Sequence, residues 1–134
     1  MTASFDLPNG PGAYALLIRL PRRLNLSVER LRHPVLDPGC YVYCGSARGP
    51  GGLAARVGRH LRRDKALRWH VDYLTASGRI IDVICRPDGS ECALVRHYGQ
   101  LPGVSTPVPG FGSSDCRQCK SHLLLVPAKF DLSV

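Results

Sequence analysis

Two segments of strand-forming residues constrain the fold of this chain most. Residues 13–20, AYALLIRL, form an apolar run that ends at Pro21, and residues 40–45, CYVYCG, alternate and are rich in β-forming side chains. Such runs, bounded by turn residues, are typical of strands. The tripeptide DPG at 37–39 is a strong turn signal directly before the second run. We therefore expect two antiparallel strands that pair with each other.

The next segment predicts a glycine-rich turn followed by a helix. Residues 46–52, SARGPGG, are unsuited to regular structure. A helix is predicted over 53–63 because apolar residues recur every four positions. These are Leu53, Val57 and Leu61. A neighbouring face of the same helix carries Arg56, His60 and Arg63.

The remaining elements complete a mixed α/β order. We expect a second helix over 68–75, a third strand over 79–86, a helix over 91–98 capped by Ser90, a loop over 99–119, and a short strand or apolar closing segment over 122–126. This order predicts a small α/β (α+β) fold in a single domain over residues 1–134. Apolar runs stay well short of the ~20 residues that span a bilayer. The N-terminus shows no secretory signal, so we expect a cytoplasmic protein without a membrane partner.

The charge of the chain points to a polyanionic partner. Eighteen Lys and Arg residues face ten Asp and Glu residues, which gives a net charge of +8. Fifteen of the cations are arginines, whose forked guanidinium groups fit phosphate oxygens. Seven cations and one anion lie between Arg48 and Arg68. A solvated helix face is the alternative, but the position after a glycine-rich loop favours a phosphate-binding face on nucleic acid.

The six cysteines are expected to be reduced thiols or metal ligands. Four of them lie among apolar residues and are expected to pack as small buried side chains. These are Cys40, Cys44, Cys85 and Cys92. The segment 116–122 reads C-x-x-C-x-x-H, and its ligands suit zinc. They are Cys116, Cys119 and His122, and the fourth ligand would come from Cys85, Cys92 or Asp115. The preferred interpretation is a polar loop over 112–115 that holds a phosphate.

Four short motifs in this order resemble the GIY-YIG nuclease superfamily. They are the tripeptide GAY at 12–14, the tripeptide YCG at 43–45, Arg56 with His60 four residues later, and Glu91 at the start of the last helix. The tripeptides depart from the literal pattern at Ala13 and Cys44. The chain is most similar to a small subfamily with a strand ending in GSA, a GGL-x-x-R-x-x-x-H helix, a WH-x-DYL segment and an FGSSDC loop. This resemblance covers about residues 12–126.

The resemblance implies a three-stranded antiparallel sheet flanked by helices, and metal-dependent hydrolysis of DNA phosphodiesters. Such a reaction needs an activated water, neutralised phosphoryl charge and help for the leaving oxygen. We expect Glu91 to hold one Mg²⁺ or Mn²⁺ ion, Arg56 to bind phosphoryl oxygens, and Tyr14 and Tyr43 to handle the water. His60 and His70 would assist. Residues expected to bind the DNA are Arg48, Arg59, Arg63, Lys65, Arg68, Ser113 and Ser114. No small-molecule cofactor is expected.

Each of these residues also has a purely structural interpretation. Tyr14 and Tyr43 could be half-buried strand residues, and Glu91 could only complement a helix dipole. The main functional alternative is a non-catalytic nucleic-acid-binding module of the same fold. A lone carboxylate on a binding face argues against that alternative, because pure binding of a polyanion has no need of it.

Overall fold

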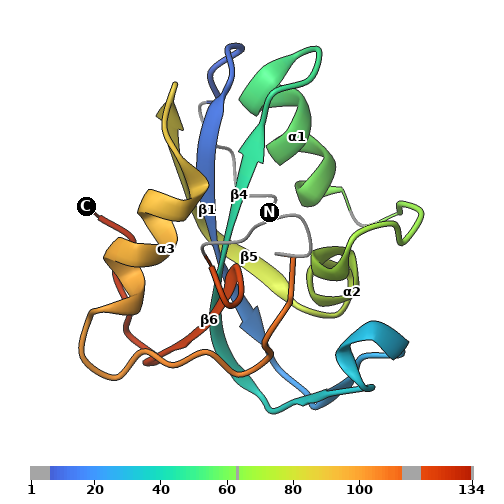
Figure 1. The fold of residues 1–134 in the computed structure, drawn as a ribbon. Helices are drawn as coiled ribbons and strands as arrows, with labels where there is room; N and C mark the ends of the chain where they lie inside the picture. Colours follow the sequence, from blue (N-terminus) through green and yellow to red (C-terminus); the bar gives the residue numbers. More distant parts are fainter. Residues whose placement is uncertain (1–6, 63, 113–118, 134) are drawn as a thin grey trace.

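The two expected strands pair as predicted. The computed structural model describes residues 7–62, 64–112 and 119–133. Strand β1 (Gly12–Leu20) runs antiparallel to strand β4 (Gly39–Ala47), with Tyr14 opposite Gly45 and Leu16 opposite Tyr43. The pairing of these two strands forms the centre of the sheet (Figure 1).

The sheet has four strands, one more than the resemblance implied. Strand β5 (Arg79–Pro87) pairs with β1, and strand β6 (Leu123–Val126) pairs with β4, so the order is β5-β1-β4-β6. The apolar segment near the C-terminus is therefore a strand rather than only a closing segment. A small separate sheet joins β2 (Leu24–Asn25) to β3 (Val35–Leu36), with the 3₁₀ turn η1 (Glu29–Leu31) between them.

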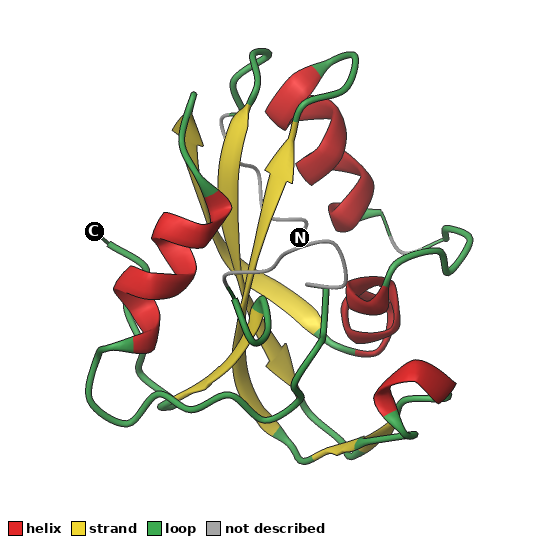
Figure 2. Cartoon of the chain, viewed as in Figure 1, coloured by secondary structure: helices red, strands yellow, loops and turns green. Residues whose placement is uncertain are grey.

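Helices cover both faces of the sheet (Figure 2). Helices α1 (Gly52–Leu61) and α2 (His70–Ser77) lie on one face, and α3 (Glu91–Gly99) lies on the other. Helix α2 begins two residues later than expected because Trp69 is extended and serves as its N-cap. Within the described residues, none of the helices has the length and apolar character needed to cross a membrane.

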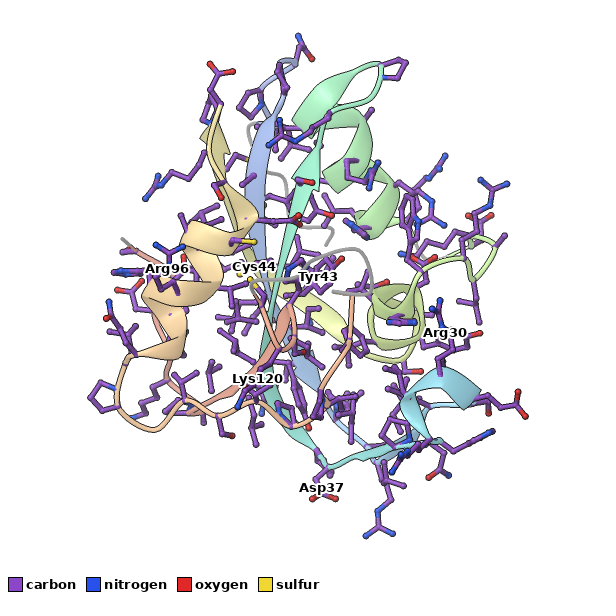
Figure 3. All side chains as sticks on the ribbon, viewed as in Figure 1. Arg30, Asp37, Tyr43, Cys44, Arg96 and Lys120 are labelled. Atoms are coloured by element: carbon purple, nitrogen blue, oxygen red, sulfur yellow. The ribbon has the colours of Figure 1, made fainter. Side chains whose placement is uncertain are left out.

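Side chains of the central strands point alternately to the two faces of the sheet and form a hydrophobic core on each face. Tyr14, Leu16 and Tyr43 pack towards α1 and α2, whereas Ala15 and Cys44 pack towards α3. Figure 3 shows Tyr43 and Cys44 on opposite sides of β4. Burial was predicted for four cysteines: Cys40 and Cys44 are buried, while Cys85 and Cys92 are only partly buried.

The glycine-rich turn before α1 is tightly packed. Gly51 and Gly52 both have positive φ angles, 81° and 56°. A Cβ atom on Gly52 would collide with the backbone oxygens of Asn9 and Gly10. The first turn of α1 is also satisfied from this segment, because Leu53 N–H donates to Gly10 O at 2.9 Å. These contacts fix the start of α1 and thereby the side chains that it carries.

Candidate functional site

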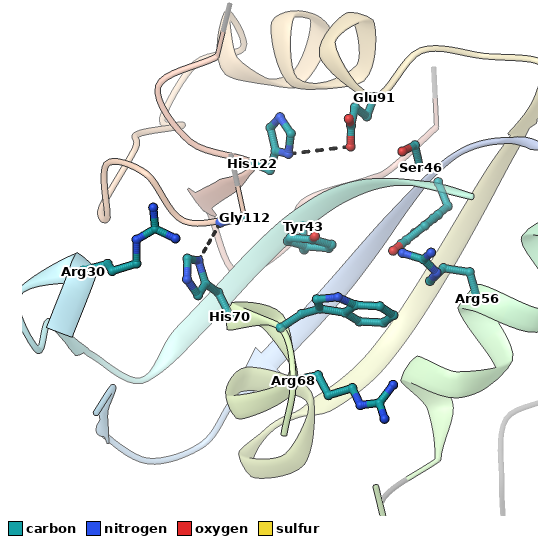
Figure 4. A pocket seen from close by; sticks show the side chains of 11 residues that line it. Arg30, Tyr43, Ser46, Arg56, Arg68, His70, Glu91, Gly112 and His122 are labelled. Atoms are coloured by element: carbon teal, nitrogen blue, oxygen red, sulfur yellow. Dashed lines mark hydrogen bonds and ion pairs between the residues drawn. The ribbon is translucent and has the colours of Figure 1, made fainter. Parts of the chain in front are cut away.

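A pocket of about 430 Å³ brings together residues from β1, β4, η1, the three helices and the segment before β6 (Figure 4). Most of its lining is polar, and three arginines contribute to it. The lining residues are Tyr14, Arg30, Tyr43, Ser46, Arg56, Arg68, Trp69, His70, Glu91, Gly112 and His122. Five of the six residues predicted to be catalytic are among them. The sixth, His60, lies directly behind Tyr14.

Tyr14 reaches the pocket through the space left by a glycine. Gly45 lies directly opposite Tyr14 in the sheet. A Cβ atom at Gly45 would collide with the phenol oxygen of Tyr14. The side chain of Tyr14 is only 1% exposed, and its oxygen lies 2.6 Å from His60 Nε2. The glycine that ends the YCG tripeptide is therefore needed for the position of the tyrosine on the neighbouring strand.

His60 is a neutral, buried partner of Tyr14. Burial is the main cause that lowers the pKa of His60 to about 3, and the nearby Lys65 charge lowers it further. The Lys65 ammonium donates to the backbone oxygen of His60 at 2.7 Å. His60 Nδ1 has no hydrogen-bond partner among the described residues. Because a buried N–H without an acceptor is rarer than a buried lone pair, we place the ring hydrogen on Nε2, where it donates to Tyr14.

The lowered pKa of His60 predicts a loss of stability in mild acid. In the unfolded chain His60 takes up a proton near its ordinary pKa of 6.5, whereas in the folded protein it stays neutral down to about 3. Its contribution is complete above pH 6.5 and decreases as pH falls, by up to about 5 kcal/mol. Urea unfolding from pH 7 to pH 4 should show this slope in wild type and a shallower one in His60→Gln. Equal slopes would contradict the assignment.

Both tyrosines are protonated phenols in the resting protein. Burial is the main cause that raises the pKa of Tyr14, and the Arg56 charge opposes this shift. Burial also raises the pKa of Tyr43, and the carboxylate of Glu91 adds to the effect. The two rings lie 6.4 Å apart between their centroids. Either phenol can donate a hydrogen bond at neutral pH. It must lose its own proton before it can act as a base and take a proton from water.

Arg56 is held against the indole of Trp69. Its guanidinium carbon lies 4.4 Å from the ring centroid, and that of Arg59 lies 4.1 Å from the same ring. Such stacking orders a guanidinium without using its hydrogen-bond donors. Against the larger effect of burial, the positive charge of Arg56 also lowers the pKa of Tyr14, so the guanidinium acts on the phenol electrostatically. The guanidinium is therefore fixed at the pocket beside the phenol.

Asp72 anchors this stack, and the sequence analysis did not identify it. Its carboxylate is fully buried and accepts two bonds from Arg59, at 2.7 and 2.9 Å. It also accepts the backbone N–H groups of Arg68 and Trp69, at 2.7 and 2.9 Å. The hydrogen bond from Arg59 is the largest cause that lowers the pKa of Asp72, to about 2, against the opposing effect of burial. The position of Asp72 in the third place of α2 was the available sequence signal.

Glu91 enters the pocket from the layer of α3. Strand β6 pairs with β4 as far as Tyr43, and His122 still accepts the N–H of Cys44, so the edge of β4 is left unpaired by this segment only beyond Cys44. Glu91 Oε2 lies 3.6 Å from His122 Nδ1, and this pair is ionic only if the imidazole is protonated. The carboxylate thus faces the tyrosines and Arg56 although its helix packs on the opposite face of the sheet.

His70 is held by the backbone of the neighbouring loop. Its Nδ1 atom accepts the N–H of Gly112 at 2.9 Å. Burial is the main cause that lowers the pKa of His70, and the charge of Arg30 adds to it. The neutral ring must therefore carry its hydrogen on Nε2.

The residues expected to bind DNA lie in different environments. Arg68 lines the pocket, and Arg48 is exposed just beyond β4. Arg59 is bound by Asp72, and Lys65 is bound to the backbone of α1. Arg63, Ser113, Ser114, Asp115 and Cys116 lie outside the described residues. Arg30 and Ser46 line the pocket without having been predicted to do so. Arg30 belongs to no recognisable motif, whereas Ser46 lies in the GSA motif, which was the available signal.

A group of possible soft-metal ligands lies next to this pocket. The ligand atoms of Cys92, Cys119 and His122 all lie within 4.8 Å of one another. Two of these were expected from the C-x-x-C-x-x-H segment, and Cys92 was one of the residues considered for completing it.

A comparison with protein-family models identifies the family of this chain. The model of the family described as "Domain of unknown function DUF123" matches residues 13–133. Neither a curated protein nor a solved structure matches the chain. Since the matched segment includes both central strands, all three helices and the final strand, the protein belongs to the DUF123 family.

Proposed function

We propose that this protein is a metal-dependent DNA endonuclease of the GIY-YIG type, which hydrolyses phosphodiester bonds. The convergence of Tyr14, Tyr43, Arg56 and Glu91 on one pocket carries this proposal. These residues are separated in sequence and come from β1, β4, α1 and α3. Their order along the chain resembles the order of the motifs in that superfamily. Because the four residues line one pocket, they can act together on one phosphate group.

The arginines of the pocket supply the phosphate-binding function. Arg56 presents fixed guanidinium donors, and Arg30 and Arg68 add positive charge along the lining. In the transition state of hydrolysis, negative charge builds on the phosphoryl oxygens. A preorganised guanidinium stabilises that charge more than it stabilises the ground state. Arg56 is the residue best placed for this role.

The two phenols are placed to handle the nucleophilic water. In hydrolysis the water oxygen bonds to phosphorus, the bond to the leaving sugar oxygen breaks, and that oxygen takes up a proton. Tyr14 accepts a hydrogen bond from His60, and the charge of Arg56 lowers the pKa of the phenol against the effect of burial, so both neighbours favour its deprotonated form. We assign Tyr14, once its own phenol proton has passed to water in the pocket, to accepting a proton from the nucleophilic water, and Tyr43 to orienting that water.

Glu91 suits a hard divalent cation. A bound Mg²⁺ or Mn²⁺ ion would lower the pKa of a coordinated water and neutralise phosphate charge. Mg²⁺ retains several waters, so one carboxylate together with substrate oxygens is sufficient. Glu91 is partly exposed, with its side chain at 29%, so water and substrate oxygens can complete such a coordination shell. Carboxylate oxygens are ligands that Mg²⁺ and Mn²⁺ prefer, whereas cysteine thiolates prefer softer metals.

The charge of the chain favours DNA as the substrate, and it also limits how DNA sequence can be recognised. The net charge of +8 favours a polyanion, and phosphate contacts of this kind do not depend on sequence. We propose that cleavage is directed by DNA structure or by single strands, in repair or processing. The alternative is a non-catalytic module that binds nucleic acid through the same pocket.

A cleavage assay tests the proposal directly. The purified protein is incubated with single-stranded, duplex and branched DNA in Mg²⁺, Mn²⁺ or EDTA. Cleavage is expected with either metal and should stop in EDTA. Glu91→Gln should lose metal-dependent cleavage while it retains DNA binding. Binding without cleavage of any substrate would support the non-catalytic module, and cleavage that survives Glu91→Gln would place the reaction elsewhere.

A further inference from the structure

Three potential metal ligands from two separate segments, the start of α3 and the residues before β6, lie close together. Cys92 is the second residue of α3, Cys119 lies in the segment before β6, and His122 directly precedes β6. One ligand atom of each residue lies within 4.8 Å of the ligand atoms of the other two. Glu91 does not belong to this group, although it is the neighbour of Cys92 in the chain.

His122 supplies a second, independent observation. The residue is only 2% exposed, and neither ring nitrogen has a hydrogen-bond partner among the described residues. Glu91 Oε2 lies 3.6 Å from Nδ1, which is beyond hydrogen-bond range. A buried imidazole without hydrogen bonds is costly, because its N–H and lone pair both lose their water. Coordination of a metal by one ring nitrogen removes part of that cost. The ring therefore has a physical reason to bind an ion at this place.

The backbone on both sides of His122 is already fixed. Its N–H donates to Phe111 O at 2.8 Å, and its carbonyl oxygen accepts the N–H of Cys44 at 3.0 Å. On the other side, Ser90 caps α3 by accepting the N–H of Ala93 at 3.3 Å. The site is thus built between two anchored segments. Cys92 lies in the first turn of α3, where the helix dipole stabilises a thiolate.

We propose that Cys92, Cys119 and His122 bind one Zn²⁺ ion. Two thiolates and an imidazole are soft and intermediate ligands that select zinc over Mg²⁺. Three protein ligands leave one tetrahedral position for water or another small ligand. The ion joins the segment before β6 to the start of α3 and so fixes one wall of the pocket. This proposal does not depend on nuclease activity.

Metal analysis of the intact protein tests the site. Protein purified without chelators is expected to contain about one zinc per chain by elemental mass spectrometry. Cys92→Ser and Cys119→Ser should each reduce the zinc content severalfold. Cys85→Ser is the matched control, because Cys85 packs towards α1 and α2 on the other face of the sheet, and it should retain full zinc. Unchanged zinc in both ligand variants would overturn the proposal.

A cobalt titration covers the case in which the ligand variants do not fold. Wild-type protein stripped of metal should bind Co²⁺ with a thiolate-to-cobalt charge-transfer band and intense tetrahedral bands, which Zn²⁺ then abolishes. A wild-type spectrum without these bands would refute the site. Neither readout involves DNA cleavage, so the zinc site and the nuclease proposal can fail separately.

Discussion

Replacing Arg56 by alanine is expected to lower DNA cleavage by roughly 10²–10³-fold, the range found when one preorganised donor to a developing oxyanion is removed. The guanidinium is ordered by Trp69 before substrate arrives, so its full effect is available in the transition state. The fold should remain intact, because Arg56 lies at a half-exposed position and its stacking contributes about 1 kcal/mol. Single-turnover cleavage rates and urea unfolding measure the two effects separately.

Matched variants separate the role of Arg56 from the loss of one positive charge. Arg22→Ala removes the same charge at an exposed position beyond the far end of β1, so it should weaken binding only slightly. Arg56→Lys keeps the charge but loses the planar fork, and an intermediate rate is expected. If Arg56→Ala cleaved DNA as fast as Arg22→Ala, Arg56 would have no role in the transition state.

The main elements of the fold could be predicted because they depend on local patterns. The apolar run at 13–20 and the alternating run at 40–45 form the two central strands, extended by one or two residues at their ends. The fourfold spacing of Leu53, Val57 and Leu61 correctly indicates α1. Strand β6 was less certain, since a short apolar run becomes a strand only when a neighbouring edge is available to pair with it.

The proximity of two site residues could be predicted only where both belong to the same short motif. Arg56 and His60 are four residues apart on a helix, so their proximity follows from helical geometry. The bond between Arg59 and Asp72 joins residues of two different packed elements, and the charge of Arg59 alone suggested a DNA contact instead. The approach of Glu91 from the opposite layer likewise depends on where β6 stops. Such long-range contacts have no periodicity that a single sequence reveals.

The group formed by Cys92, Cys119 and His122 shows the same limit of sequence-based prediction. The C-x-x-C-x-x-H segment indicates a soft-metal site, and its spacing favours Cys116 as a partner of Cys119. The structure places Cys92, from a different element, within reach of Cys119 and His122. Sequence spacing can identify ligands that are local, but a ligand contributed by another helix is determined by how the elements pack.

The buried carboxylate of Asp72 leads to the largest expected change in stability. Asp72→Ala should lower the free energy of unfolding by about 3–5 kcal/mol, because Arg59 loses its partner and two backbone N–H groups lose their acceptor. For a domain of this size the expected decrease in Tm is about 10–18 °C. Asp64→Ala, which removes an exposed carboxylate, is the matched control and should change stability by less than about 0.5 kcal/mol.

The pH dependence distinguishes the charge of Asp72 from its shape. The pKa of this carboxyl is about 2 in the folded protein against an ordinary value of 3.8, so its charge stabilises the fold above pH 4. That contribution, about 2.5 kcal/mol by linkage, is lost as pH falls towards 2. Asp72→Asn keeps the shape and lacks the charge, so its deficit relative to wild type should decrease over this range. A deficit that stays constant down to pH 2 would show that the charge of Asp72 does not stabilise the fold, and that the asparagine variant is weakened by its hydrogen-bond geometry instead.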